Sequence, residues 1–432
     1  MNIEVMNGAA TKAERTEERE QVTPASSPGL SGMTTLIFAV ACGLSVANVY
    51  FAHPLLDAMA HDFAIAPASI GIVVMVTQIG YALGLLFIVP LGDLFDRRKL
   101  IAGQAVLSAV ALIAVGVAPN AAMLLASLAV VGLLAVVVQV LVAYAADLAA
   151  PSQRGRAVGT VTSGVITGIL LARFVAGVVA DFAGWRWVYV VSAALTLFMA
   201  VLLYLILPRH EAERPSTSYP RLLASVVLLF VKEPLLRVRA VLALLIFASF
   251  NVLWAPLVLP LSAPPFSLSH TAIGLFGLAG VAGALGARWT GGLVDRGRGQ
   301  LVTGLSLLLM TAAWLPIAFM GMSLWLLVAG IVMLDLAIQA THVTNQSLIF
   351  ARRPDARSRL VGGYMIFYSL GSALGSIVST MAYGVAGWKR CLAARRWHRL
   401  AGAAVLGADA ARRPVNLLGV DLVLGRGFLE GG

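Results

Sequence analysis

Long apolar stretches with few charges constrain this chain more than any other feature. Hydrophobic residues make up 59% of its 432 residues and charged residues 12%, against roughly 45–50% and about 25% in soluble domains. A helix of about 20 apolar residues crosses a bilayer core. We predict an all-α polytopic membrane protein and exclude a soluble multidomain enzyme. The predicted spans are 34–56, 69–90, 100–118, 121–148, 158–181, 186–207, 239–261, 271–290, 300–320, 323–349 and 360–384.

Basic residues occupy alternate loops between these spans. They follow spans 2, 4, 8 and 10, whereas the opposite loops hold only Arg186 besides histidines. The positive-inside rule therefore predicts a cytoplasmic N-terminus and a cytoplasmic 208–238 loop in a cell inner (plasma) membrane. The same loops account for the net charge of +11, so no nucleic-acid partner is expected.

The spans and loops predict five regions. The first and last of them are polar or basic, and the central loop contains an apolar segment, 219–233, that could lie along the membrane surface. The regions are a disordered cytoplasmic tail (1–33), a six-helix half (34–207), the central loop (208–238), a second half with spans 7–11 (239–388) and an aberrant basic tail in place of span 12 (389–432).

The two halves repeat each other at an offset of about 200 residues. Asn48–Ala52 in span 1 parallels Asn251–Ala255 in span 7, and Gly168 in span 5 parallels Gly371 in span 11. Internal repeats of this kind are typical of secondary transporters, which bind their solute near the membrane midplane between the repeats.

The loop after span 2 carries a motif, Gly92-Asp93-Leu94-Phe95-Asp96-Arg97-Arg98-Lys99. It resembles the major facilitator superfamily signature Gly-x3-Asp-(Arg/Lys)-x-Gly-(Arg/Lys)-(Arg/Lys), without the later glycine. The resemblance covers about 34–388 and implies two six-helix halves that alternate between conformations. It also implies a conformational latch made by Gly92, Asp96 and Arg97 with Asp147, and by the partial second copy Gly291, Asp295 and Arg296. Alternatively, the basic residues only set the topology.

Two further segments refine the resemblance. Tyr81–Gly84 and Pro90–Asp93 look like bacterial drug:proton antiporter and sugar-efflux permeases, which implies proton-coupled efflux of a small solute. Span 5 departs from the antiporter signature, because Ala172-Arg173 stands where those proteins have Gly-Pro. Two alternatives therefore remain. One is a uniporter or importer on the same scaffold, and the other is a truncated non-transporting remnant.

Polar residues on one face of span 10 mark a candidate solute pathway. Asp335, Gln339, His342 and Gln346 recur at helical spacing, with Asn345 adjacent. Polar groups inside a bilayer must meet other polar groups or water. The resemblance places further pathway residues on spans 1, 4 and 7, with weaker candidates on span 2: Asn48, His53, Gln139, Asn251 and Trp254, then Gln78 and Tyr81. Interhelical hydrogen bonds without a solute are the alternative.

Asp335 is the candidate proton-coupling residue, because it is the acidic residue predicted deepest in a span. His342 or Arg173 would be its partner, since an intramembrane charge needs a counter-charge or water. Arg173 could instead extend towards the outer interface. We expect a monomer whose partners are a small solute, protons and membrane lipid. The sequence contains no motif for phosphate-loop or metalloprotease chemistry, so we expect neither an enzyme with catalytic residues nor a cofactor or metal.

The C-terminal segment departs from the pattern. After Gly387-Trp388 a twelfth span should follow, but six basic residues, one of them a histidine, occur between 389 and 399, on the side where the positive-inside rule disfavours them. A shift of reading frame near 389 is one hypothesis, and a divergent tail is the other. The coding DNA distinguishes them.

Overall fold

A computed structural model describes residues 31–150, 153–207, 218–281, 290, 292–352 and 357–391. These residues form helices and no strands, and ten helical stretches are long and apolar enough to cross a membrane. The ten stretches agree with ten predicted spans to within two helical turns. The predicted span at 271–290 is described mainly as a shorter apolar helix, His270–Gly280. The prediction of an all-α polytopic membrane protein is confirmed.

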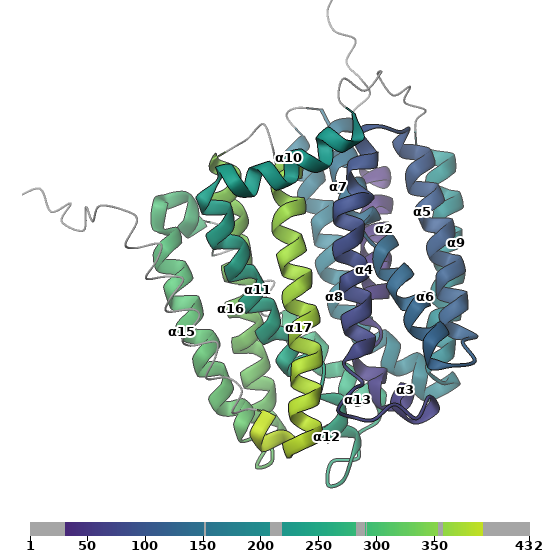
Figure 1. Cartoon of the computed structure of the whole chain (residues 1–432), viewed down its shortest axis with the longest axis vertical. Helices are drawn as coiled ribbons and strands as arrows, with labels where there is room; N and C mark the ends of the chain where they lie inside the picture. The colour runs from purple at the N-terminus through teal and green to yellow at the C-terminus, as the bar shows by residue number, and fades with distance from the viewer. Residues whose placement is uncertain are drawn as a thin grey trace, which may run out of the picture.

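The helices stand side by side and most run between the two ends of the molecule (Figure 1). The first half consists of α2 (Gly32–Tyr50), η1 (His53–Leu55), α3 (Leu56–Asp62), α4 (Ile72–Phe87), η2 (Val89–Asp93), α5 (Arg97–Gly116), α6 (Ala121–Leu134), α7 (Val137–Leu148), α8 (Arg154–Ala183) and α9 (Trp185–Ile206). After α10 (Tyr219–Lys232), the second half consists of α11 (Pro234–Trp254), α12 (Val258–Ser262), α13 (His270–Leu275), η3 (Phe276–Gly280), η4 (Val294–Arg298), α15 (Gly299–Ala318), α16 (Leu324–Arg352) and α17 (Arg357–Cys391).

Residues predicted as tails lie mostly outside the described part of the chain. Of the predicted N-terminal tail, residues 1–30 lie outside it, and α2 already begins at Gly32. Residues 208–217 of the central loop and 392–432 of the basic tail also lie outside it. The start of the basic tail is helical, because α17 continues to Cys391 across a break at Gly387, whose φ is 64°.

Local signals explain where several helices begin. The side chain of Asp96 accepts hydrogen bonds from the backbone of Arg98 and Lys99 and so caps α5. Asn120 caps α6 and Ser269 caps α13 in the same way. Helix α8 ends at Gly184, whose φ of 89° favours glycine and lets α9 start at once in a new direction.

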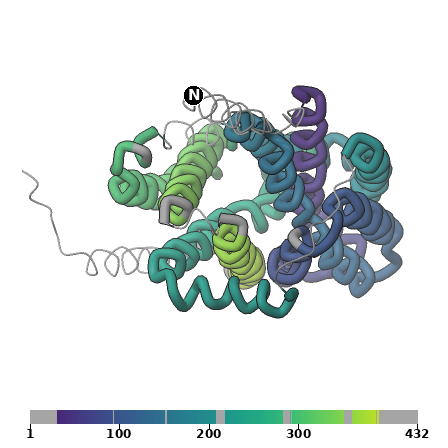
Figure 2. Tube along the Cα trace, turned by 90° about the horizontal axis from the view of Figure 1, so that it is seen from above, coloured from purple at the N-terminus to yellow at the C-terminus, as the bar shows by residue number. Residues whose placement is uncertain are grey.

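The two halves each contain a corresponding helix pair that approaches closely at glycines. An added Cβ at Gly164 or Gly168 of α8 would lie 2.1–2.2 Å from a backbone oxygen of α2. An added Cβ at Gly371 or Gly375 of α17 would lie 2.1–2.3 Å from a backbone oxygen of α11. Small residues at such crossings let helices pack without a hydrophobic driving force between them. The two halves therefore share a packing device as well as sequence, and Figure 2 shows them grouped on opposite sides of the molecule.

Helix α10 lies across one end of the bundle (Figure 1). It contacts both halves, because the Tyr219 hydroxyl donates to the Phe87 carbonyl oxygen of the first half and Phe230 stacks on Phe367 of the second. This end is called the α10 end below, and the opposite end, where α3 and α12 lie, is called the α12 end.

The two halves meet closely at the α12 end. The Ser376 hydroxyl of α17 donates to the Gly71 carbonyl at the start of α4, and the Gly71 N–H donates to Thr380. An added Cβ at Gly177 of α8 would lie 2.2 Å from the carbonyl oxygen of His270. Towards the α10 end, by contrast, polar residues of α8 are exposed. These are Thr160, Thr162 and Ser163. The molecule is therefore closed at the α12 end.

Candidate functional site

A group of buried polar and aromatic residues joins the two halves between the ends. Its first-half members come from α2, η1 and α8, and its second-half members from α11, α16 and α17. We call it the inter-half cluster and define it as Tyr50, His53, Arg173, Asn251, Trp254, Asp335 and Tyr368. All seven are buried, although His53 and Arg173 are basic and Asp335 is acidic.

Hydrogen bonds cross from one half to the other within this cluster. The hydroxyl of Tyr50 bonds to the hydroxyl of Tyr368. The Nε2 atom of His53 lies 3.3 Å from Oδ1 of Asn251, and its Nδ1 atom lies 3.2 Å from the carbonyl oxygen of Tyr50. The two contacts that cross between the halves, Tyr50 with Tyr368 and His53 with Asn251, change if the halves move relative to each other, so the cluster can respond to the conformational state.

Arg173 occupies the aromatic part of the cluster. Its guanidinium carbon lies 4.0 Å from the ring centroid of Trp254, and 5.3 Å from those of Tyr50 and Phe250. Such contacts stabilise a desolvated cation. The indole Nε1 of Trp254 also donates to Oδ1 of Asp335 at 3.5 Å. Trp254 therefore contacts both the cation and the acid.

The predicted pairing of Arg173 with Asp335 is indirect. The Nε and Nη2 atoms of Arg173 have no hydrogen-bond partner among the described residues, and Trp254 bonds the carboxylate instead. Extension of Arg173 towards the outer interface is not observed, because its side chain is 2% exposed and lies between the halves. His342, the other predicted partner, packs away from Arg173 against Phe247 and Tyr364.

His342 of the span 10 stripe and the adjacent Asn345 belong to a second polar group. The hydroxyl of Tyr364 bonds to Nδ1 of His342 at 2.9 Å and accepts from Nδ2 of Asn345 at 3.4 Å. Arg239 donates from Nη1 to Oδ1 of Asn345 and to Thr303. These residues all come from the second half. The two remaining members of the stripe, Gln339 and Gln346, are half-buried on α16.

The first-half pathway candidates separate into two kinds. Asn48 accepts a 2.6 Å hydrogen bond from Ser192 of α9, so it forms the interhelical bond that was the alternative to a solute role. Gln139 of α7 donates to the hydroxyl of Tyr81 on α4 at 3.4 Å, and Gln139 is half-buried. Gln78 is buried and its Oε1 atom has no partner among the described residues.

Several residues of these groups were missed by the sequence prediction. Tyr50, Tyr364 and Tyr368 looked like ordinary aromatic residues, although Tyr364 and Tyr368 are four residues apart and share a helical face. Arg239 was placed at the boundary of span 7, and the structure buries it to 1% exposure within α11. The only signal for Arg239 in the sequence was its position, as an arginine near the end of a predicted span.

The motif after span 2 forms a polar contact within the first half. Arg97 pairs with Asp147 at the end of α7, and its Nε donates to the carbonyl oxygen of Gly92 at 3.0 Å. An added Cβ at Gly92 would meet only ordinary contacts, with the nearest atom 3.6 Å away. In this conformation Gly92 does not mark a close approach between helices.

The second motif copy is only partly described. Gly291 and the side chain of Asp295 lie outside the described residues, and Arg296 is exposed. Gly297, which follows, has a φ of 78° and interrupts the helical geometry between η4 and α15. Its left-handed backbone favours glycine at this turn.

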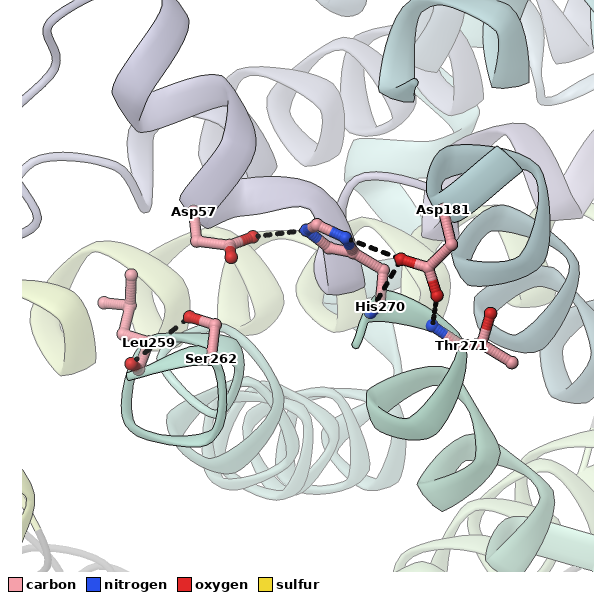
Figure 3. Close-up of polar contacts among 6 residues, drawn as sticks. All are labelled: Asp57, Asp181, Leu259, Ser262, His270 and Thr271. Carbon is pink, nitrogen blue, oxygen red and sulfur yellow. Dashed lines mark hydrogen bonds and ion pairs between the residues drawn. The ribbon is translucent and has the colours of Figure 1, made fainter. Parts of the chain in front are cut away.

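At the α12 end, His270 links the two halves (Figure 3). Its Nε2 atom lies 3.2 Å from Oδ1 of Asp57 on α3, and its Nδ1 atom lies 3.1 Å from Oδ1 of Asp181 on α8. The carboxylate of Asp181 also accepts from the backbone N–H groups of His270 and Thr271. Both imidazole nitrogens face carboxylate oxygens, so both contacts form together only when the ring is protonated.

These contacts affect the protonation of His270. The hydrogen bond to Asp57 is the largest effect and raises the pKa of His270 above its ordinary value, with burial acting in the opposite direction and Asp181 adding to the rise. Sequence analysis missed this residue, because it stands in a loop between spans and its partners are 213 and 89 residues away.

Comparison with known proteins places this architecture in a family. The model of the Major Facilitator Superfamily matches residues 36–376. The chain belongs to the Major Facilitator Superfamily. It is 44% identical over 365 residues to a protein of Escherichia coli strain K12 that carries the transporter name YgaY, covering 84% of this chain and 92% of that protein. A protein of Streptomyces coelicolor strain A3(2), also named as a transporter, is 32% identical over 86% of this chain and 87% of its own length.

Solved structures of the family share the fold. The nucleoside transporter NupG matches with a TM-score of 0.70 and 15% identity, over 86% of this chain and 98% of that one. A bacterial homologue of the human lysosomal transporter Spinster, in an inward-facing and occupied conformation, matches with a TM-score of 0.67 and 15% identity over 88% and 91%. This chain is thus a multi-pass membrane protein of a transporter family whose members carry small solutes.

Proposed function

We propose that this protein is a secondary active transporter that moves a small solute across the inner membrane by alternating access, with Asp335 as the proton-binding residue. We further propose that it exports its solute and works as a monomer. The observation that carries the proposal is the position of Asp335: it is buried, it is held by Trp254, and it lies in a cluster built from both halves.

The orientation of the molecule is part of this proposal. The basic loops and α10 lie at one end, and the positive-inside rule assigns that end to the cytoplasm. The α12 end, which is closed, then faces outwards, and the described conformation is an inward-facing state. Exposed polar residues of α8 near the α10 end support this assignment.

Proton coupling follows from the electrostatics of the cluster. A buried carboxylate is unfavourable unless a cation or hydrogen bonds compensate it. Asp335 has one neutral donor, Trp254, and a nearby cation, Arg173, whose Nε and Nη2 atoms have no hydrogen-bond partner among the described residues. A rocking motion that moves α8 relative to α16 changes this balance, and so changes the affinity of Asp335 for a proton.

Import together with a proton is the second candidate function, and Arg173 is the observation that favours it. Protonation of Asp335 removes its negative charge and leaves the positive charge of Arg173 unbalanced in the cluster. A proton and an anionic solute would therefore bind together. Export in exchange for protons is supported by the resemblance of Tyr81–Gly84 and Pro90–Asp93 to drug:proton antiporters. A uniporter would be indifferent to the proton gradient, and a non-transporting remnant would show no flux.

Inside-out membrane vesicles that carry an imposed pH gradient and a fluorescent pH probe test these alternatives. A solute library is added, and the direction of the solute-dependent pH change separates exchange from co-transport. Asp335→Asn should abolish the solute-dependent pH change. Asp62→Asn is the matched control, because Asp62 is a carboxylate at the α12 end that pairs with Arg186 within the first half. Wild-type pH-driven flux in Asp335→Asn would refute the proposal.

A further inference from the structure

One edge of the Arg173 guanidinium, in the middle of the molecule, has no hydrogen-bond partner in the described part of the chain. Its Nε and Nη2 atoms are buried and have no hydrogen-bond partner among the described residues. The whole residue is 2% exposed. A buried charged group without hydrogen-bond partners is strongly unfavourable, and aromatic contacts compensate it only in part. An unpartnered cation at such a position indicates a role in which a partner arrives from outside the chain.

The geometry of the unpartnered edge selects the chemistry of that partner. Nε and Nη2 carry the two roughly parallel N–H bonds on one side of the guanidinium plane, and this pair forms the two-bond fork that matches a carboxylate. The indole of Trp254 and the rings of Tyr50 and Phe250 surround the cation. An acidic group that reaches the fork would thus have its organic body among aromatic rings.

Two glycines of η3 pack closely against this arrangement. An added Cβ at Gly277 would lie 3.1 Å from Cβ and 3.2 Å from Cδ of Arg173, and an added Cβ at Gly280 would lie 2.8 Å from Oδ2 of Asp335. Larger residues at these two positions of η3 would displace the cation or the acid. The surrounding residues come from both halves, so a rocking motion can cover and uncover the fork.

We propose that Arg173 is the solute-recognising cation of this transporter, and that the solute is a small organic monoanion whose carboxylate is joined to a flat apolar or aromatic body. The inference rests on the proposed transport function, in the form of proton–solute co-transport described above as the second candidate, and names its solute class. Arg173 is the only arginine or lysine among the cluster residues, and a single guanidinium suits one negative charge better than a phosphate dianion. Asp335 is the competing acid, and a bound carboxylate is accommodated best when Asp335 is neutral.

Ligand binding to the purified full-length protein in detergent tests the inference without a proton gradient. The probes are benzoate, phenylacetate and indole-3-acetate, each compared with its own neutral amide and with phenyl phosphate, by thermal shift and isothermal titration. At least one carboxylate should raise the melting temperature of the wild type and bind at least 10-fold more tightly than its amide. If no carboxylate binds, or if amides or phenyl phosphate bind equally well, the inference is wrong.

Two variants assign the binding to the fork. Arg173→Met keeps a long side chain without charge and should weaken carboxylate binding at least 100-fold, while the melting temperature of the unliganded protein stays equal or rises, because an unpartnered buried charge is removed. Arg173→Lys keeps the charge without the fork and should weaken binding at least 10-fold, and it serves if Arg173→Met does not fold. If Arg173→Met instead lowers the melting temperature of the unliganded protein and leaves carboxylate binding unchanged, Arg173 is a structural cation that stabilises the fold.

Failure of this inference and failure of the proposed function give different results. Asp335→Asn should lose the proton-coupled pH change in vesicles and yet bind the carboxylate at least as tightly as the wild type, because a competing negative charge is removed. Weaker carboxylate binding in Asp335→Asn than in the wild type would contradict the arrangement proposed around Arg173.

Discussion

Removing the imidazole of His270 should open the α12 end of the molecule. In His270→Ala the contacts of Nε2 with Asp57 and of Nδ1 with Asp181 are lost. Hydrogen bonds to charged groups contribute roughly 1.5–3 kcal/mol each when well shielded. The three side chains are 21–25% exposed, so solvent screening reduces the value to about 1 kcal/mol for each contact. The backbone bonds to Asp181 remain.

The two losses sum to about 2 kcal/mol, which is roughly a 30-fold change in the ratio of closed to open molecules at this end, at 1.4 kcal/mol for each factor of ten. Pulsed electron paramagnetic resonance between spin labels at Phe182 and Met322 measures this ratio. Both positions are strongly exposed, and each lies on a different half. The longer-distance population should grow in His270→Ala and not in His61→Ala, an exposed histidine of α3. Equal distance distributions in His270→Ala and wild type would refute the reasoning.

The same contacts predict how the ratio depends on pH. The pKa of His270 is raised in the closed form, so protonation stabilises closure. This contribution is fully present below the ordinary histidine pKa of about 6.5 and is lost as the pH rises through the raised value. We expect the α12 end to open as the pH rises in the wild type, and His270→Gln to flatten this dependence. A His270→Gln variant with the wild-type pH profile would show that another group is responsible.

Two further predictions concern helix packing and the motif after span 2. Gly168→Ala should lower the melting temperature by several degrees, since its Cβ would lie 2.2 Å from the carbonyl oxygen of Gly43 and overpacking costs about 1–3 kcal/mol; Gly159→Ala in the same helix, with open space around it, should be neutral or stabilising. A double-mutant cycle on Arg97 and Asp147 should give a coupling of about 1 kcal/mol or less, because Asp147 is 57% exposed, and a coupling of several kcal/mol would show a shielded ion pair.

The sequence determined the membrane-spanning helices, because each span needs about 20 apolar residues regardless of its neighbours. It also determined the polar stripe of α16, since helical periodicity fixes which residues of one helix share a face. On these grounds the sequence predicted Asp335 as the proton-coupling residue. The charge pattern of the loops and the repeat between the halves likewise required no knowledge of tertiary contacts.

Only the tertiary structure decided which polar groups meet. Periodicity gives the face of a helix and not the helix that it packs against, so Asn48 turned out to bond Ser192 within its own half, whereas His53 meets Asn251 across the halves. The partners of His270 come from α3 and α8, far away in sequence. The unpartnered fork of Arg173 depends on how α8 is rotated against α2, α11 and η3. No local sequence pattern records this rotation, because helix docking is set by side-chain shapes on several helices at once.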